Sequence, residues 1–194
     1  MGRMASIVRE TRETRIEASL DLDNWAPALI ATNLPLLTHF LSAFSIHGRF
    51  GLNLKAEGDV EVDPHHLVED VGIVLGKAFR QAIGAGENLV RFGQRHLPMD
   101  EALVLCAVDI SGRGQCYWGP GFPERAVGGI HSEVWPEFFH GFARQSGVTV
   151  HLRYVAGENA HHVYEACFKS FGVALSEAVS IREGRGVPST KGVL

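Results

Sequence analysis

The sequence predicts an α+β fold made of two related halves, because one motif occurs twice and strand and helix patterns follow it in both copies. His65-His66-x-x-Glu69 recurs as His161-His162-x-x-Glu165, a separation of 161 − 65 = 96 residues in a chain of 194. The match continues at the same spacing, pairing Gly76 with Gly172, Ala78 with Ala174, Phe79 with Leu175 and Ala82 with Ala178. A repeat of this length indicates duplication of one structural unit.

The first half contains patterns for a hairpin, two helices and a further strand. Residues 6–22 alternate polar and apolar side chains, which predicts a β-hairpin. Residues 36–46 carry apolar side chains at helical spacing and stop at His47-Gly48. A strand over residues 50–56 follows, and Asp63-Pro64 is typical of a helix start, with Asp63 as the N-cap. That helix is expected to end near Ile83.

The second half repeats this order. Residues 90–110 are expected to form two strands around a turn at Leu97-Pro98-Met99, with residues 115–118 as a candidate third strand. The remaining predicted elements are a helix from near Ser132, a strand over residues 148–155 and a helix over residues 161–179. Each half thus has the predicted order β-β-α-β-α, a sheet with helices on one face. We expect half-domains at residues 1–86 and 87–183, followed by a tail at residues 184–194.

Composition argues against several classes of protein. A hydrophobic content of 45% with 21% charged residues is ordinary for a globular chain. The net charge of −4 argues against a dominant basic surface for a nucleic-acid partner. No apolar run approaches the roughly 18 residues of a membrane span, and the first residues lack a secretory pattern, so we expect a cytoplasmic protein. The three cysteines have no CxxC spacing, which argues against a disulfide framework or a zinc ribbon.

The repeated motif carries side chains that bind transition metals. Residues i and i+4 share a helix face and i+3 lies close by, so Glu69 can join either His of its doublet on one ion. Adjacent histidines point about 100° apart and can therefore serve different ions. Imidazole with carboxylate suits Mn, Fe, Co, Ni or Zn better than Ca or Mg. One such motif is a weak signal, whereas two copies in register predict a metal centre.

The shorter helices of the two halves align as well. His39-Phe-Leu-Ser-Ala-Phe44 corresponds to Glu137-Phe-Phe-His-Gly-Phe142. Each half therefore offers one more candidate ligand, His39 or Glu137. Taken alone, these two residues would be interpreted as a helix-cap His and a surface Glu, but their matching positions in the repeat favour coordination.

These segments together resemble the imidazoleglycerol-phosphate dehydratase family, and the similarity covers nearly the whole chain. The matching segments are Arg12-Glu13-Thr14, His47-Gly48, Gly58-Asp59 through His65-His66-x-x-Glu69-Asp70, Arg91-Phe92-Gly93, Pro98-Met99-Asp100-Glu101-Ala102-Leu103, Asp109-Ile110-Ser111-Gly112-Arg113, Gly157-x-Asn159-x-His161-His162-x-x-Glu165-Ala166-x-Phe168-Lys169 and Gly186-Val187-Pro188-Ser189-Thr190-Lys191-Gly192. The second doublet segment and the tail are the most specific of them.

The resemblance implies a lyase of histidine biosynthesis that removes water from imidazole glycerol phosphate to give imidazole acetol phosphate. It implies a ribosomal protein S5 domain 2-like fold, two Mn²⁺ ions per active site, and a homo-oligomer of twenty-four subunits with active sites at subunit contacts. Carried over by position, the metal ligands are His39, His65, His66, Glu69, His161, His162 and Glu165, with Glu137 where the family often has His.

The resemblance also implies residues for catalysis and for substrate binding. Glu13 is the candidate that handles the proton, and Glu69 and Glu165 are ligands with a second candidate role in proton transfer. The expected substrate contacts are Glu13, Arg91, Arg113, Lys169, Ser189, Thr190 and Lys191. Bidentate guanidinium contacts suit a phosphate. Without the resemblance, the tail would be interpreted as a frayed terminus and Lys169 as an exposed helix residue.

Two departures from the family pattern leave alternatives open. Asn33 and Thr38 stand where the family usually has Gly and Asp. Asn tolerates positive φ, so the turn is expected to persist. Thr38 supplies no carboxylate to orient His39, a supporting role whose loss typically costs roughly 10–100-fold. The alternatives are a catalytically drifted, metal-dependent oligomeric protein of the same family and, less favoured because no nucleophile motif is present, a two-metal hydrolase.

Overall fold

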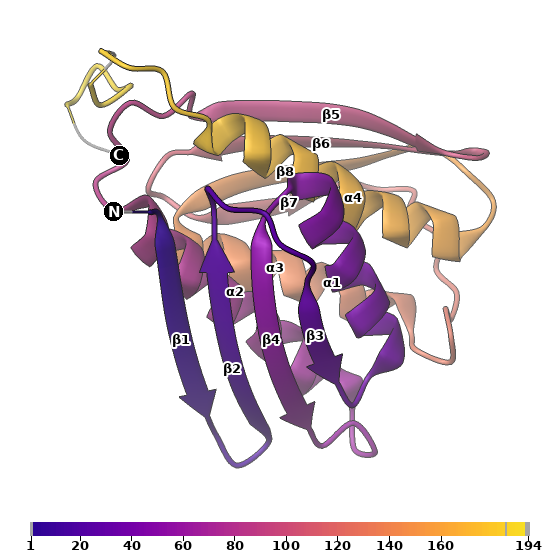
Figure 1. Ribbon diagram of the computed structural model, residues 1–194. Helices are drawn as coiled ribbons and strands as arrows, with labels where there is room; N and C mark the ends of the chain where they lie inside the picture. Colours follow the sequence, from indigo (N-terminus) through magenta and orange to yellow (C-terminus); the bar gives the residue numbers. More distant parts are fainter. Residues whose placement is uncertain (1, 185, 193–194) are drawn as a thin grey trace.

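The computed structural model describes residues 2–184 and 186–192, in which two four-stranded sheets enclose a layer of α-helices (Figure 1). The first half contains β1 (Met4–Glu10), β2 (Thr14–Asp21), β3 (Leu29–Thr32), α1 (Pro35–Gly48), β4 (Gly51–Gly58) and α2 (Pro64–Ile83). The second half contains β5 (Phe92–Met99), β6 (Ala102–Ile110), β7 (Gln115–Trp118), a 3₁₀ turn (Ser132–Val134), α3 (Trp135–Ser146), β8 (Val148–Ala156) and α4 (Ala160–Val179).

The two sheets have the same topology. Their strand orders are β1-β2-β4-β3 and β5-β6-β8-β7. In each sheet the last strand of the order pairs in parallel with its neighbour, and the other pairs are antiparallel. The predicted α+β class, the duplication and the helices on one face of each sheet are therefore confirmed.

Two details differ from the expected β-β-α-β-α order. Each half has a third strand before its first helix, and β3 in the first half was not predicted because four residues at a sheet edge are too short to establish a period of two. The expected turn at Leu97-Pro98-Met99 is wrong. Pro98 lies in β5 opposite Leu103, and the chain turns at Asp100, which has φ 50°. An edge strand tolerates this proline, whose missing N–H costs no ladder bond on the open side.

The helices of the two halves pack against each other across the duplication. On α2, a Cβ added at Gly76 would lie 2.5 Å from the Phe142 carbonyl oxygen of α3. On α4, a Cβ at Gly172 would lie 2.5 Å from the Phe44 carbonyl oxygen of α1. These contacts are equivalent under the repeat. Each long helix therefore packs closely on the short helix of the other half.

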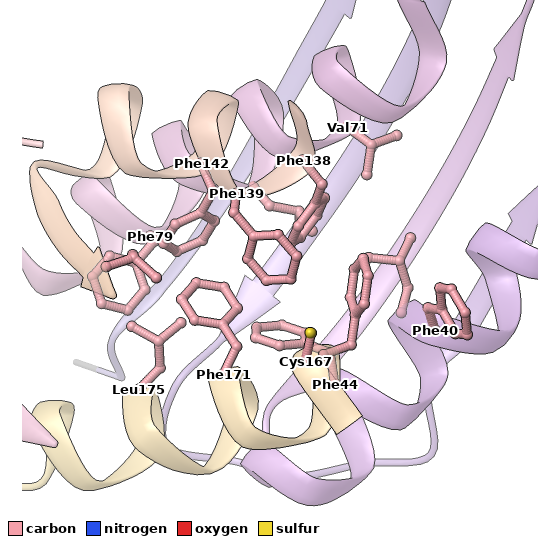
Figure 2. Packing of buried hydrophobic residues seen from close by; sticks show 14 of the residues in the cluster. Phe40, Phe44, Val71, Phe79, Phe138, Phe139, Phe142, Cys167, Phe171 and Leu175 are labelled. Carbon is pink, nitrogen blue, oxygen red and sulfur yellow. The ribbon is translucent and has the colours of Figure 1, made fainter. Parts of the chain in front are cut away.

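Aromatic rings fill the space between these helix pairs (Figure 2). The rings of Phe142 and Phe171 meet edge to face with centroids 5.0 Å apart, an arrangement that favours aromatic pairs. Phe138 and Phe139 lie in the same cluster, and all four rings are fully buried. Phe44 and Phe79 of the first half pack on Phe171 and Phe142 of the second, so residues 1–86 and 87–183 are proposed as halves of one packed unit. Among the described helices, none combines the length and apolar character needed to cross a membrane.

Candidate active site

Both histidine doublets lie in the first turn of a long helix that is capped by a side-chain oxygen. The Asp63 carboxylate accepts a hydrogen bond from the His65 backbone N–H at 2.8 Å, which confirms the predicted cap. The Asn159 side-chain oxygen accepts from the His161 backbone N–H at 2.9 Å. Each cap contributes about 1 kcal/mol to helix stability. The caps start α2 and α4 at equivalent residues and so present the two doublets in the same register.

Three of the predicted ligands converge at one end of the contact between α1 and α4. His39 Nε2 lies 3.0 Å from Glu165 Oε2, and His161 Nε2 lies 3.2 Å from the same oxygen. Their ligand atoms all lie within 4.8 Å of one another. Two imidazoles and a carboxylate form a donor set that suits a transition metal. Both histidines are partly exposed, with 49% and 40% of their side chains accessible, so a metal there would be open to substrate.

The Glu165 carboxylate is held in its ionised form. Lys169 Nζ, one turn further along α4, lies 2.7 Å from Glu165 Oε1. Burial raises the pKa of Glu165, but the hydrogen bonds from Lys169 and His39 outweigh burial and lower this pKa to about 2. The carboxylate is therefore charged at neutral pH, as a metal ligand must be.

The equivalent residues of the first half are less closely gathered. His65 Nε2 lies 3.8 Å from Glu69 Oε2, and the guanidinium of Arg144 on α3 donates a hydrogen bond to Glu69 Oε1. Glu137 forms no hydrogen bond or ion pair with the residues that the structure describes. In the described part of the chain, His39, His161 and Glu165 form the only group of three or more His, Cys, Asp or Glu side chains whose ligand atoms all lie within 4.8 Å of one another.

The second histidine of each doublet is paired with a carboxylate. His66 Nδ1 lies 3.0 Å from Asp59 Oδ1, and this hydrogen bond raises the pKa of His66. His162 Nδ1 lies 2.9 Å from Glu101 Oε2, and this bond, with help from backbone N–H groups, lowers the pKa of Glu101 to about 2. A carboxylate at Nδ1 orients the ring and leaves Nε2 for a metal.

Asp59 and Glu101 were not predicted for this role. Both belong to segments that resemble the family, but neither lies at a sequence spacing from its histidine that is typical of a metal-site motif. Glu101 lies in the β5–β6 turn, 61 residues from His162 in sequence. This contact forms only when the β5–β6 turn folds against the start of α4, so no local sequence pattern predicts it.

The two departures near α1 have structural roles of their own. The Thr38 hydroxyl lies 2.9 Å from the Thr32 hydroxyl, whereas the His39 ring pairs with Glu165. Asn33 Nδ2 donates to the Gly58 carbonyl oxygen at 2.6 Å, and the Gly58 N–H donates to Asn33 Oδ1 at 3.1 Å. The chain bends at Asn33 as expected, but Asn33 is not among the described residues with positive φ. It instead ties the start of α1 to the end of β4.

Glu13 lies in the β1–β2 turn beside the first doublet. Its backbone oxygen accepts a hydrogen bond from the Asp59 N–H at 3.1 Å, and its negative charge contributes to the raised pKa of His66. The side chain is exposed. Glu13 is thus free to meet a ligand near the start of α2.

The residues predicted to contact the substrate phosphate lie apart from the histidine doublets. Arg91 binds Asp109 through Nε at 2.7 Å and the Pro188 carbonyl oxygen through Nη1 at 2.7 Å. Arg113 Nη2 lies 4.0 Å from the same aspartate. The hydrogen bond from Arg91 to Pro188 anchors the tail that carries Ser189, Thr190 and Lys191 near the C-terminal end of α4 (Figure 1).

The two groups of predicted site residues occupy opposite ends of α4. The Arg91 N–H donates to the Ala178 carbonyl oxygen, thirteen residues (178 − 165) beyond Glu165. At 1.5 Å rise per residue this separation is about 20 Å. Lys169, in contrast, stays with Glu165. Within one chain, Arg91 and the tail that it anchors therefore do not reach the cluster of His39, His161 and Glu165.

Comparisons with known proteins agree with the fold and the motifs. A family model described as Imidazoleglycerol-phosphate dehydratase matches residues 32–175. Proteins of that name from Trichlorobacter lovleyi and Lacticaseibacillus casei are 46% and 45% identical, over 100% and 99% of this chain and 100% of each relative.

Two solved structures extend the agreement to three dimensions. The dehydratase from Staphylococcus aureus N315 has a TM-score of 0.83 at 33% identity and covers 92% of this chain and 99% of its own. The Pyrococcus furiosus protein has a TM-score of 0.84 at 39% identity, with 97% and 100% covered. These names support a dehydratase that acts in histidine biosynthesis. The chain belongs to the imidazoleglycerol-phosphate dehydratase family.

Proposed function

We propose that this chain is a manganese-dependent lyase that converts imidazole glycerol phosphate to imidazole acetol phosphate at a site with two Mn²⁺ ions. The observation that carries this proposal is the convergence of His39, His161 and Glu165 from helices of different halves. Their Nε2 and Oε2 atoms lie within 4.8 Å of one another and form a donor set that suits a divalent transition metal.

The ligands of the second ion come from the first half in this proposal. His65 and Glu69 already approach each other on α2, and Glu137 is the residue of α3 that corresponds to His39. His66 and His162 would contribute their Nε2 atoms, since Asp59 and Glu101 engage the opposite ring nitrogens. The assignment of each ligand to one ion is part of the proposal.

The dehydration must remove hydrogen from a carbon that is barely acidic. When bound, Mn²⁺ would supply Lewis acidity toward the substrate imidazole. Glu13 would accept the proton from carbon, because its exposed carboxylate lies beside the first doublet. The hydroxyl leaves the neighbouring carbon with a proton as water, and the enol that forms becomes the ketone. Glu69 and Glu165 serve first as ligands and are secondary candidates for moving this proton.

The substrate phosphate would be bound by Arg91, Arg113 and the tail residues Ser189, Thr190 and Lys191. Since these residues lie at the far end of α4 from Glu165 in one chain, we propose that a neighbouring subunit supplies them to each metal site. This arrangement fits the homo-oligomer of twenty-four subunits expected from the family resemblance. Lys169 would complete the anion site from the metal side. The cytoplasmic location expected from the sequence stays a prediction.

One assay tests the proposed function directly. Metal-depleted protein would be given Mn²⁺ and imidazole glycerol phosphate, and the ketone product would be followed spectroscopically. We expect no product without metal, and product after Mn²⁺ is restored. A protein that binds Mn²⁺ and assembles but makes no product would instead support the drifted, metal-dependent oligomer, in which Thr38 has left His39 without an orienting carboxylate.

A further inference from the structure

The two glutamates of the repeat use their oxygens in the same way. Glu165 gives Oε1 to Lys169 at 2.7 Å and turns Oε2 toward His161 at 3.2 Å. Glu69 gives Oε1 to the Arg144 guanidinium and turns Oε2 toward His65 at 3.8 Å. In both clusters one oxygen is held by a basic side chain while the other faces the imidazole four residues earlier.

The two basic residues are not equivalent under the duplication. Lys169 corresponds to position 169 − 96 = 73, which is Ile73. Arg144 is on α3, which aligns with α1 at the spacing 137 − 39 = 98, so its counterpart is Ile46. The first cluster therefore has isoleucine at the position equivalent to Lys169, and the second has isoleucine at the position equivalent to Arg144. The same contact to the glutamate is therefore made from two different helices.

The packing of α2 on α3 explains how Arg144 reaches its partner. A Cβ at Gly141 of α3 would lie 2.7 Å from the Glu69 carbonyl oxygen, so only glycine permits this approach without a shift. Arg144 follows three residues later, on the same face of α3. Its long side chain then spans the short remaining distance to Glu69.

We propose that Arg144 is the positioning residue for Glu69 and does in the first cluster what Lys169 does in the second. This inference rests on the proposed function, because Glu69 acts there as a metal ligand. A charge-assisted hydrogen bond at Oε1 restrains the carboxylate and leaves Oε2 directed at the site that His65 shares.

Because the Arg144–Glu69 pair is exposed, a role in positioning Glu69 can be distinguished from a role in folding stability. The Arg144 side chain is 54% exposed, and exposed ion pairs contribute little to folding stability. Removing Arg144 should therefore leave the unfolding of the metal-free protein almost unchanged. Its effect should fall on the first metal cluster, because supporting contacts to metal ligands typically alter affinity by roughly 10–100-fold.

The test measures Mn²⁺ binding to the assembled full-length protein by isothermal titration calorimetry, with bound manganese counted after dialysis. Arg144→Ile places the residue of the other half at this position, and we expect it to weaken one of two ions by roughly 10–100-fold and to spare the other. Adding Ile73→Lys to that variant recreates the Lys169 arrangement, and we expect it to restore affinity. Arg95→Met is the matched control, since Arg95 is exposed on β5 and forms no ion pair among the described residues.

Each result bears on the proposal. Wild-type affinity for both ions in Arg144→Ile would overturn it, as would equal weakening by Arg95→Met. Failure of Ile73→Lys to restore binding in a variant with wild-type urea unfolding would also overturn it. If that double variant unfolds without cooperativity, Arg144→Lys becomes the rescue test, with most of the affinity expected to remain and complete loss contradicting the proposal. A wild type that binds no second ion would refute the proposed dinuclear function before any substitution is made.

Discussion

His39 and Glu165 lie 126 residues apart in the sequence, yet His39 Nε2 is 3.0 Å from Glu165 Oε2. They meet because α1 of the first half packs along α4 of the second. The close approach of these helices depends on Gly172, where a Cβ would lie 2.5 Å from the Phe44 carbonyl oxygen. Packing between the halves thus creates the candidate metal cluster.

Gly172→Ala should destabilise the protein. The added methyl group has to displace the backbone of α1, and overpacking of this kind typically costs about 1–3 kcal/mol. Urea unfolding of the metal-free protein measures the change. Gly2→Ala is the control, because a Cβ there meets only the Asn24 side chain at 3.7 Å, an ordinary contact. An unchanged urea midpoint in Gly172→Ala would show that the helices are not in close contact.

The stability of the metal-free protein should depend on the ionisation of Glu165. Its folded pKa of about 2 lies below the ordinary value of 4.5, so the folded state binds its proton less tightly than the unfolded state does. The resulting stabilisation is present above about pH 4.5 and is lost as the pH falls toward 2. At 1.36 kcal/mol per pKa unit, its upper limit is about 3 kcal/mol.

Urea unfolding at a series of pH values, for the wild type and for Glu165→Gln, measures this contribution. The difference in unfolding free energy between the two proteins should shrink as the pH falls from 4.5 toward 2. A difference that stays constant through this range would mean that Lys169 and His39 do not hold the carboxylate in its charged form. The comparison also removes the contribution of Glu101, which both proteins share.

Arg113→Gln should weaken substrate binding without changing metal content. The Arg113 side chain is 67% exposed and has only a 4.0 Å contact to Asp109, so the fold does not depend on it. Loss of a charge-assisted contact to phosphate, about 1.5–3 kcal/mol, should raise KM by roughly tenfold or more. Steady-state kinetics with Mn²⁺-loaded enzyme check this, and Arg15→Gln, also on an exposed arginine, is expected to keep the wild-type KM.

Glu13→Gln should abolish turnover while leaving bound manganese unchanged. The amide keeps the shape of the side chain but accepts no proton, and positioned acid–base groups typically contribute about 10²–10⁴-fold to rate. The measurement pairs kcat with manganese content, and Glu17→Gln on the neighbouring strand serves as the control. Substantial residual activity in Glu13→Gln would remove Glu13 from the mechanism.

Much of the architecture could be predicted because it depends on local patterns. The repeat of His-His-x-x-Glu, the Asp63 cap and the apolar period of the helices are properties of neighbouring residues, and the structure has these helices at the expected places. Local patterns failed where the signal was short or ambiguous. β3 has four residues, and Pro98 suggests a turn unless the strand is known to lie at an edge.

The candidate site was only partly accessible to the same reasoning. Residue types and spacing identify the ligands, but they do not tell which ligands meet. Aligning the two repeats places Ile73 at the position equivalent to Lys169. The alignment does not predict that Arg144, which lies on another helix, contacts Glu69. Nor does any local pattern indicate that Arg91 and Glu165 lie at opposite ends of α4.

The duplication, the class of fold and the chemistry of the side chains follow from the amino-acid sequence, because each can be recognised from short segments of the chain. Which of these side chains meet depends on how the helices pack, since His39 joins His161 and Glu165 while Glu69 turns to Arg144. The physical reason is that each long helix packs on the short helix of the opposite half. This packing depends on glycine contacts and buried aromatic rings from both halves, and local sequence periodicity does not predict which of them meet.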